Sequence, residues 1–257
     1  MKKRFRNILF LCLLLIAAGG AAYLFWYQSS LEKNADVYEE ARREVKEETK
    51  KEPEETESAE MSKPEIPIDF DALWEINPDA YAWIVIPGTS VDYPILQSPT
   101  DDQYYLDHNL DGSEGYPGSI YTQRYNGTDF QDFNTVIYGH NMKDKSMFGD
   151  LHRYEDSSFM RENSRVIVYT PEKILTYQIF AAVVYDDRHI LLNYDFTQME
   201  DRQAFLDSLN MLRDMRSNID STVEAGPDDR ILTLSTCIGS EDHHRYLVEA
   251  VLIDEQS

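Results

Sequence analysis

Hydrophobic and polar positions divide the chain into three zones. Residues 8–26 carry no charged side chain, and the basic segment "MKKRFRN" at residues 1–7 precedes them. Residues 31–60 are almost entirely polar and charged, with too few apolar positions to build a core. Short apolar runs alternate with turn residues from about residue 66 onward. We therefore predict one folded domain at residues 66–257, because roughly 190 residues can bury a single compact core.

The uncharged run has the length of a membrane-spanning helix. At about 1.5 Å per residue it extends about 28 Å, close to the hydrocarbon thickness of a bilayer. A cleaved signal peptide is the alternative, since the small residues at 17–22 resemble a cleavage region. The apolar run continues past them into Tyr23, Phe25 and Trp26, an aromatic end that suits the membrane interface. This continuation favours an uncleaved transmembrane anchor at residues 8–26.

Lys2, Lys3, Arg4 and Arg6 directly precede the anchor. The positive-inside rule therefore places residues 1–7 in the cytoplasm and residues 27–257 outside the cell. We expect a single-pass protein of the cell membrane with an extracellular domain. Residues 27–65 are predicted to be a charged spacer that is helical in its first half, disordered after Pro53, and holds the domain off the membrane.

The pattern within the domain predicts mostly β structure. A short amphipathic helix is expected around "DFDALWEI", before Asn77-Pro78. Seven or eight short strands follow, rich in β-branched and aromatic residues and separated by turn signals, which indicates an all-β barrel or sandwich. One helix is predicted at residues 198–216, where an apolar stripe would pack on the barrel between strands six and seven. The predicted strands are "AWIVIPG", "DYPIL", "GSIYTQ", "NTVIYG", "RVIVYT", "LTYQIFAAVVY", "RILTLSTC" and "RYLVEAVLI".

Charge and cysteine content narrow the function. The formal net charge of −23 at pH 7 argues against a nucleic-acid partner, because phosphate binding needs a basic face. The two cysteines are Cys12, inside the anchor, and Cys237, so they cannot pair with each other across a bilayer. One unpaired thiol in an exported domain indicates a reactive or intermolecular residue, and a buried packing cysteine is the alternative.

We expect no metal and no cofactor. Asp107 and Asp111 stand at early positions of a calcium-loop pattern, but Gly118 occupies the position where a bidentate Glu is needed. The pair His243-His244 has no second cluster at metal-ligand spacing. A polar turn and a solvated loop are therefore the better interpretations of these two segments.

Two strand ends carry candidate catalytic side chains. His140 follows the apolar strand in "NTVIYGHNM", and Cys237 ends the strand in "ILTLSTC". A strand end fixes a side chain on a rigid scaffold while leaving it open to a substrate. A thiolate is a nucleophile, and a nearby imidazole or cation favours it. Taken singly, each residue has a plainer interpretation, as a surface histidine and a packing cysteine.

Arg245 makes the catalytic interpretation more specific. The strands "RILTLSTC" and "RYLVEAVLI" are close in sequence, so an antiparallel hairpin would place Arg245 opposite Cys237, with Cβ atoms about 5 Å apart. A guanidinium stays charged at working pH, and it could donate to a developing oxyanion. A surface arginine in a salt bridge is the alternative.

These residues together resemble the sortases, the cysteine transpeptidases of Gram-positive bacterial surfaces. The resemblance is carried by "TLSTC" at residues 233–237, Arg245 on the next strand and His140 far upstream. "YGHNM", the predicted helix and the start "DFDALWEINPDAYAWI" are most similar to class B sortases, over residues 66–254. The resemblance implies a closed eight-stranded β-barrel with N-terminal helices, and a peptide groove near strands six and seven.

The resemblance also implies an activity and a set of site residues. The family cleaves a C-terminal sorting signal after its threonine, forms a thioester, and transfers the acyl group to an amine of a peptidoglycan precursor, such as lipid II or its cross-bridge. Cys237 would be the nucleophile, and His140 would protonate the leaving amine and deprotonate the incoming one. Arg245 and the backbone N–H of Ile238 would hold the oxyanion. The residues matching the substrate contacts of the family are Leu106, Leu191, Leu192 and Ser235.

Three other functions remain open at this point. A hydrolytic cysteine peptidase could use the same residues, and a non-catalytic β-barrel could bind surface peptides without forming a covalent adduct. A pilin polymerase of the same class is the third. Against it, no lid motif is evident, and no second apolar segment follows the last predicted strand before Ser257.

Overall fold

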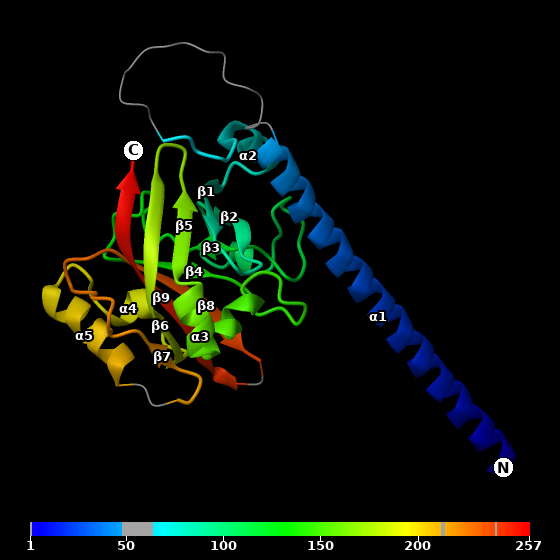
Figure 1. Cartoon of the computed structure of the whole chain (residues 1–257). Helices are drawn as coiled ribbons and strands as arrows, with labels where there is room; N and C mark the ends of the chain where they lie inside the picture. Colours follow the sequence, from blue (N-terminus) through cyan, green and yellow to red (C-terminus); the bar gives the residue numbers. More distant parts are fainter. Residues whose placement is uncertain (1, 48–63, 212–213, 240) are drawn as a thin grey trace.

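The computed structural model describes residues 2–47, 64–211, 214–239 and 241–257, and its centre is a closed β-barrel (Figure 1). The sheet has the order β5-β1-β2-β3-β4-β8-β9-β6-β7, and the pairing of β5 with β6 closes it. The predicted eight-stranded barrel is confirmed. The additional strand β7 has two residues, too few to give a periodic pattern. The strands are β1 Ala80–Val85, β2 Asp92–Leu96, β3 Tyr121–Thr122, β4 Asn134–Tyr138, β5 Arg165–Tyr169, β6 Ile174–Asp186, β7 Asn218–Ile219, β8 Ile231–Ile238 and β9 Glu241–Gln256.

Strand β8 lies between two partners of opposite direction. It pairs in parallel with β4, with Tyr138 opposite Ser235, and antiparallel with β9. Strands β4 and β8 are buried along almost their whole length, which fits their runs of Val, Ile and Leu. One rim of the barrel therefore contains the segment that follows β4, the end of β8 and the start of β9.

Short helices fill the connections between the strands. Helix α2 begins after Asp69, whose carboxylate accepts from the N–H of Ala72 at 3.0 Å, and this cap explains its position. The short helices other than α2 and the one expected at residues 198–216 were not predicted from the sequence, because a short helix shows too little hydrophobic periodicity to be recognised. The helices after the N-terminal one are α2 Phe70–Ile76, η2 Tyr104–Leu106, η3 Gly149–Glu155, α3 Ser157–Glu162, α4 Ile190–Asn193 and α5 Met199–Asn210.

The predicted helix at 198–216 is correct in place but too long. Helix α5 ends at Asn210, and beyond it the carboxylate of Asp214 accepts from the backbone N–H of Arg216 at 2.8 Å. Such a local side-chain contact stabilises a turn in place of a further helical turn. The stripe of Phe205, Leu206 and Leu209 is buried as expected, whereas Met199 and Met211 are exposed.

The buried apolar side chains form two clusters. The larger one fills the barrel and includes Trp83, Ile95 and Leu234. The smaller one lies where α5 covers the outer face of the sheet, and joins Phe205 to Val183 and other residues. This cover confirms that the helix packs on the barrel.

The N-terminal helix α1, Lys2–Glu47, extends away from the barrel toward the N-terminus (Figure 1). Residues 8–26 lie within it, and its described side chains between residues 9 and 25 are exposed. Among the described residues, one helix is long and apolar enough to cross a bilayer, and it is this one. Because exposed leucine and phenylalanine side chains favour an apolar solvent, the helix has the composition that a membrane span requires.

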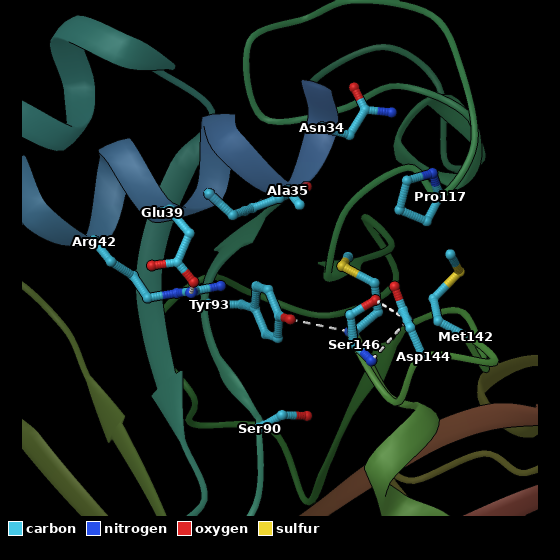
Figure 2. Close-up of a pocket in the computed structure, with 12 residues that line it drawn as sticks. Asn34, Ala35, Glu39, Arg42, Ser90, Tyr93, Pro117, Met142, Asp144 and Ser146 are labelled. Carbon is cyan, nitrogen blue, oxygen red and sulfur yellow. Dashed lines mark hydrogen bonds and ion pairs between the residues drawn. The ribbon is translucent and has the colours of Figure 1, made fainter. Parts of the chain in front are cut away.

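The C-terminal part of α1 packs on the barrel, although it falls in the segment expected to be a spacer. Tyr38, Ala41 and Val45 belong to the main core, and the Tyr38 hydroxyl donates to the carbonyl of Gly118 at 2.9 Å. Lys46 forms an ion pair with Asp92 at 2.6 Å. Figure 2 shows the groove between this helix and the loop that follows His140. The disorder predicted after Pro53 falls at residues 48–63, outside the described residues.

Candidate active site

Cys237 is the exposed residue near the end of an otherwise buried strand. The six residues of β8 before it are buried, and the thiol side chain is exposed and free of a disulfide. The inner part of β8 is anchored in the sheet by β4 and β9. The thiol is therefore accessible to a substrate while its backbone belongs to a rigid strand.

His140 reaches Cys237 through the parallel pairing of β4 with β8. The register continues beyond Tyr138 and Ser235, because the N–H of Gly139 donates to the Ser235 carbonyl at 3.1 Å. The hydroxyl of Thr236 then donates to the carbonyl of Gly139 at 2.7 Å. A further step along both strands places His140 beside Cys237, so two residues far apart in sequence lie together.

The ring of His140 is oriented by one hydrogen bond and one aromatic contact. Its Nε2 lies 2.9 Å from the carbonyl oxygen of Leu106, and a carbonyl can only accept, so Nε2 carries the proton. The ring packs edge-on against Tyr116, with centroids 4.9 Å apart. In the neutral ring the lone pair is consequently on Nδ1, which is the nitrogen able to take up a proton.

Arg245 stands directly opposite Cys237 in the β8–β9 ladder, as the hairpin argument predicted. Its Nη1 donates to the carbonyl of Asp242 at 3.1 Å and to that of His244 at 2.9 Å. These two bonds hold the guanidinium on its own hairpin. A permanent positive charge therefore lines the same cleft as the sulfur.

The three side chains line one cleft of about 250 Å³. Leu106 and Ser235, two of the four residues matched to substrate contacts, also line it. The cleft has aromatic, aliphatic and charged walls, as a groove for an extended peptide requires. Its further lining residues are Tyr121, Tyr138, Gly139, Asp186, Asp187, Arg188, His189, Ile190, Thr236 and Leu247.

Leu191 and Leu192 do not line this cleft. They lie in the short helix α4 and line a separate hollow next to Tyr125 and Tyr194. The first residue of α4, Ile190, is buried and takes the place in the cleft that the sequence assigned to its neighbours. Because successive residues of a helix point in different directions, only one residue of the "ILL" run can face the cleft here.

His189 is a second imidazole in the cleft that sequence reasoning did not identify. Its Nε2 donates to the side-chain oxygen of Gln123, 2.7 Å away. Burial lowers the pKa of this histidine, and among the described residues its Nδ1 has no hydrogen-bond partner. His189 lies in "RHILLNYDF", between the sixth predicted strand and the predicted helix. That position was the available indication in the sequence that it belongs to the cleft.

Ile238 follows the thiol at a break in the sheet. Cys237 pairs with Arg245, but Ile238 pairs with Glu241, so the register shifts between the two residues. The peptide unit that joins Cys237 to Ile238 therefore leaves the regular ladder. Its N–H is the candidate oxyanion donor.

No group of three His, Cys, Asp or Glu side chains that could hold a metal ion occurs in residues 2–47, 64–211, 214–239 and 241–257. In the calcium-like segment, the Asp111 carboxylate accepts from the backbone N–H of Ser113 at 3.0 Å. This contact is typical of a local polar turn.

The arrangement can perform nucleophilic acyl transfer. A thiol is exposed between an imidazole with a free lone pair and a fixed cation, which is the constellation that activates a nucleophile and stabilises a developing oxyanion.

Comparisons with known proteins agree with this geometry. The Sortase domain family matches residues 84–253. Sortase B of Listeria monocytogenes is 38% identical over 174 residues, covering 67% of this chain and 68% of that protein. The crystal structure of Bacillus anthracis sortase B in complex with AAEK1 superimposes with a TM-score of 0.71 at 29% identity, covering 87% of this chain and 98% of that one.

A substrate complex is among the similar structures. The Staphylococcus aureus sortase B-substrate complex has a TM-score of 0.63 and 27% identity, covering 89% of this chain and 94% of that one. The family match, the class B relatives and the shared barrel agree with the sequence motifs around His140 and Cys237. This chain therefore belongs to the sortase family, is most similar to its class B members, and is a cysteine transpeptidase.

Proposed function

We propose that this transpeptidase is anchored in the membrane and attaches a surface protein to the cell wall. It cleaves a C-terminal sorting signal after its threonine and transfers the acyl group to an amine of a peptidoglycan precursor. The observation that carries the proposal is the register of β8. Its parallel partner brings His140 to Cys237, and its antiparallel partner brings Arg245 to the other side.

In the first half of the reaction the thiolate of Cys237 attacks the threonine carbonyl carbon. A carbon–sulfur bond forms, and the carbonyl π electrons move to the oxygen, which accepts hydrogen bonds from Arg245 and from the Ile238 N–H. Collapse of this intermediate breaks the carbon–nitrogen bond. His140, which holds the former thiol proton of Cys237 on its Nδ1, gives that proton to the leaving amine, and a thioester remains on Cys237.

In the second half an amine of the acceptor attacks the thioester. His140 removes the proton from the incoming amine through the nitrogen that carries the lone pair. The carbon–sulfur bond breaks and the thiolate of Cys237 returns. A new amide bond joins the surface protein to the peptidoglycan precursor.

The substrate assignment is supported by the cleft and by the relatives. Leu106, Ser235 and Ile190 provide apolar and small walls next to the thiol, which suits the side chains of an extended peptide. The Staphylococcus aureus relative was solved as a substrate complex. We propose the same cleft as the site of the sorting signal in this chain.

The membrane assignment is supported by helix α1. Its apolar, exposed segment and its basic start favour a single span with a cytoplasmic N-terminus and an extracellular catalytic domain. Transfer to a membrane-bound precursor requires a catalytic domain close to the extracellular surface of the cell membrane.

A peptide library tests the proposal. The full chain in detergent is mixed with fluorogenic sorting pentapeptides, with and without an amine acceptor such as triglycine. We expect cleavage after threonine, an amide product with the amine, and no cleavage by Cys237→Ala. Cleavage by Cys237→Ala at the wild-type rate, or no cleavage by the wild type, would contradict the proposal. If the enzyme forms only the hydrolysed product although the amine is present, the result would favour a peptidase.

A further inference from the structure

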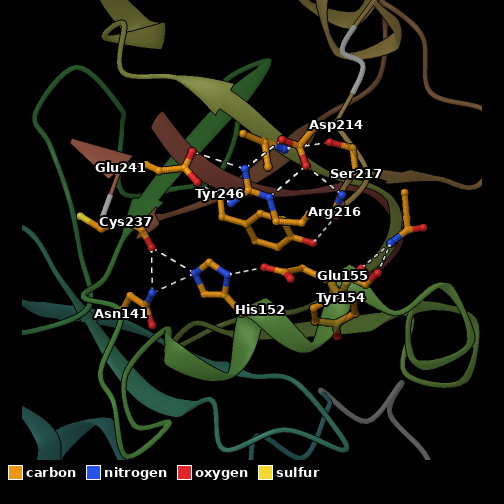
Figure 3. A network of polar contacts seen from close by, with 12 residues as sticks. Asn141, His152, Tyr154, Glu155, Asp214, Arg216, Ser217, Cys237, Glu241 and Tyr246 are labelled. Carbon is orange, nitrogen blue, oxygen red and sulfur yellow. Dashed lines mark hydrogen bonds and ion pairs between the residues drawn. The ribbon is translucent and has the colours of Figure 1, made fainter. Parts of the chain in front are cut away.

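The backbone carbonyl of Cys237 is held by two side chains from distant segments. The Nδ2 of Asn141 lies 3.0 Å from this oxygen, and the Nε2 of His152 lies 3.0 Å from it (Figure 3). Asn141 follows His140 directly, and His152 belongs to η3. Neither residue has a role in the mechanism above.

His152 is itself fixed from two sides. Its Nδ1 lies 2.8 Å from the Oε1 of Glu155, and its ring stacks on the ring of Tyr246 with centroids 4.9 Å apart and an angle of 22°. Tyr246 is fully buried in β9, opposite Thr236 of β8. The imidazole side chain is only 13% exposed. A ring held in this way presents Nε2 to the Cys237 carbonyl in one orientation.

Asn141 completes the contact. Its Nδ2 also lies 2.9 Å from the Nε2 of His152. A protonated Nε2 donates to the Cys237 oxygen and an unprotonated Nε2 accepts from Asn141, so these two contacts of Nε2 belong to different proton states. An amide nitrogen carries two protons, which lets Asn141 donate to the carbonyl whatever the proton state of His152. The carbonyl therefore has a donor at all times.

Fixing this carbonyl also fixes the next N–H. In a trans peptide the C=O of one residue and the N–H of the following residue point in opposite directions in one plane. The one cis bond in the described part of the chain is Tyr116-Pro117, so the Cys237–Ile238 peptide is trans. Strand β4, which Asn141 follows closely, lies on one side of β8, and β9 lies on the other. The Ile238 N–H is therefore directed to the side where Arg245 stands.

The ladder is irregular at this position. Cys237 pairs with Arg245 and Ile238 pairs with Glu241, so the register shifts across the peptide unit between them. Such a shift disrupts the ladder locally. The contacts of Asn141 and His152 with the Cys237 carbonyl add a constraint on this peptide from outside the pairing of β8 with β9.

We propose that Asn141 and His152, supported by Glu155, are positioning residues that orient the Ile238 N–H as an oxyanion donor. The inference rests on the proposed transpeptidase mechanism. None of the three is among the residues that line the catalytic cleft. Their effect is confined to the state in which the oxyanion exists, because binding of the ground-state peptide does not require that donor.

The test uses His152→Phe, which keeps a ring on Tyr246, and Asn141→Ala, both in the full chain in detergent. The substrate is the library pentapeptide that the wild type cleaves best. We expect kcat to fall about 10- to 100-fold with KM within twofold, less than the roughly 100- to 1000-fold of an oxyanion donor removed outright, because the Ile238 N–H is misoriented and not deleted. The matching peptide aldehyde, which ends in threoninal, forms a tetrahedral adduct that carries the same oxyanion, and its affinity should fall by a similar factor. Alkylation of Cys237 by iodoacetamide involves no oxyanion, and its rate should stay within threefold of the wild type.

His108→Phe is the matched control. The Nδ1 of His108 lies 2.7 Å from Asp107 and its ring stacks on Tyr104, so, like His152, it has a carboxylate partner and a stacked tyrosine, whereas no contact with Cys237 is among its hydrogen bonds. Its kcat should stay within twofold of the wild type. His152→Gln, whose amide can donate to the same carbonyl, should recover part of the loss.

Two outcomes would overturn the inference. One is an unchanged kcat and aldehyde affinity in both His152→Phe and Asn141→Ala. The other is a parallel loss of aldehyde affinity and iodoacetamide reactivity, which would indicate a general disturbance of the strand end. In both cases the wild type still cleaves the peptide. Absence of cleavage by the wild type would instead contradict the proposed function, and the inference with it.

Discussion

Cys237 and Arg245 are direct partners in the antiparallel ladder of β8 and β9, and the guanidinium of Arg245 donates to two carbonyls of that same hairpin. The distance between sulfur and cation is therefore set by backbone pairing. The cation does not depend on a distant element for its place. A fixed charge of this kind costs little reorganisation when negative charge develops on a substrate oxygen.

Removal of the Arg245 guanidinium should slow catalysis without unfolding the barrel. We expect Arg245→Ala to lower kcat/KM of peptide cleavage about 100- to 1000-fold, the range for loss of an oxyanion donor. Arg245→Lys keeps the charge but loses the planar fork, so the expected loss is about 10- to 100-fold. Steady-state cleavage of the best library peptide measures both.

Arg161→Ala is the matched control for Arg245. This exposed arginine of α3 contacts the hydroxyl of Ser158 at 3.4 Å and is not among the residues that line the catalytic cleft. Its kcat/KM should equal that of the wild type within twofold. If Arg245→Ala stayed within threefold of the wild type, the guanidinium would have no part in stabilising the oxyanion.

Gly139 should not tolerate a methyl group. A Cβ at this position would lie 2.5 Å from the Cδ1 of Ile120 and 2.7 Å from the ring of Phe148. Overpacking of this kind costs about 1–3 kcal/mol, and Gly139 also carries the two hydrogen bonds that align the end of β4 with β8. We expect Gly139→Ala to lower the free energy of unfolding by that amount and kcat/KM by at least tenfold.

Urea unfolding followed by tryptophan fluorescence, together with peptide cleavage, tests this expectation. Gly226→Ala is the control, because the nearest atom to its Cβ would be 3.6 Å away, an ordinary contact distance. It should change neither quantity appreciably. Equal behaviour of the two variants would show that the close approach at Gly139 relaxes freely and that the prediction is wrong.

The docking of α1 should contribute both stability and activity. Tyr38 is buried, and its hydroxyl donates to Gly118, while Asn34 donates to the carbonyl of Tyr116, whose ring contacts His140. Loss of a buried aromatic ring costs about 3–5 kcal/mol. We therefore expect Tyr38→Ala to lower the free energy of unfolding by about 3 kcal/mol and to reduce kcat as the loop against His140 loosens.

Glu40→Ala serves as the comparison for Tyr38, because Glu40 lies exposed on the same helix and, within the described residues, forms an ion pair with Arg43 at 3.8 Å. Its effect on unfolding should be within about 0.5 kcal/mol. A Tyr38→Ala protein as stable as Glu40→Ala would mean that the helix does not depend on the barrel contact.

The pairing of Cys237 with Arg245 could be predicted because the two strands are close in sequence, and a hairpin fixes which residues face each other. The meeting of His140 with Cys237 could not be worked out in the same way. It depends on a parallel pairing between β4 and β8, and hydrophobic periodicity identifies strands without saying which ones pair. Only the resemblance to a family indicated it.

Other parts of the site could not be predicted from the sequence, for different reasons. In "ILL" at residues 190–192 all three positions are apolar, so the pattern does not say which one faces the cleft. Asn141 and His152 are polar residues after a strand and in a short helix, where solvent exposure is the usual expectation. The buried face of α1 has helical spacing, but it stands among many charges, and that composition suggested a spacer.

Glu249 is a fully buried carboxyl in β9, and its surroundings favour the neutral form. Burial raises its pKa to about 8. The Thr233 hydroxyl lies 2.7 Å from the Glu249 carboxyl and 2.9 Å from the Oδ1 of Asn134. A hydroxyl has one proton, so it can donate to Asn134 and accept from a protonated Glu249. The chain of bonds is complete only when the carboxyl keeps its proton.

The stability of the protein should consequently fall as pH rises. Between about pH 4.5, where an unfolded glutamate titrates, and about pH 8, the folded state holds a proton that the unfolded state has released. The stabilising contribution is fully present below the unfolded pKa and is lost as pH rises through the folded pKa, with a slope of about 1.4 kcal/mol per pH unit. Glu249→Gln cannot titrate, so the wild-type unfolding free energy should decline relative to the variant from pH 5 to pH 8. Urea unfolding of both proteins at each pH measures the difference, and parallel curves would show that Glu249 is ionised in the folded barrel.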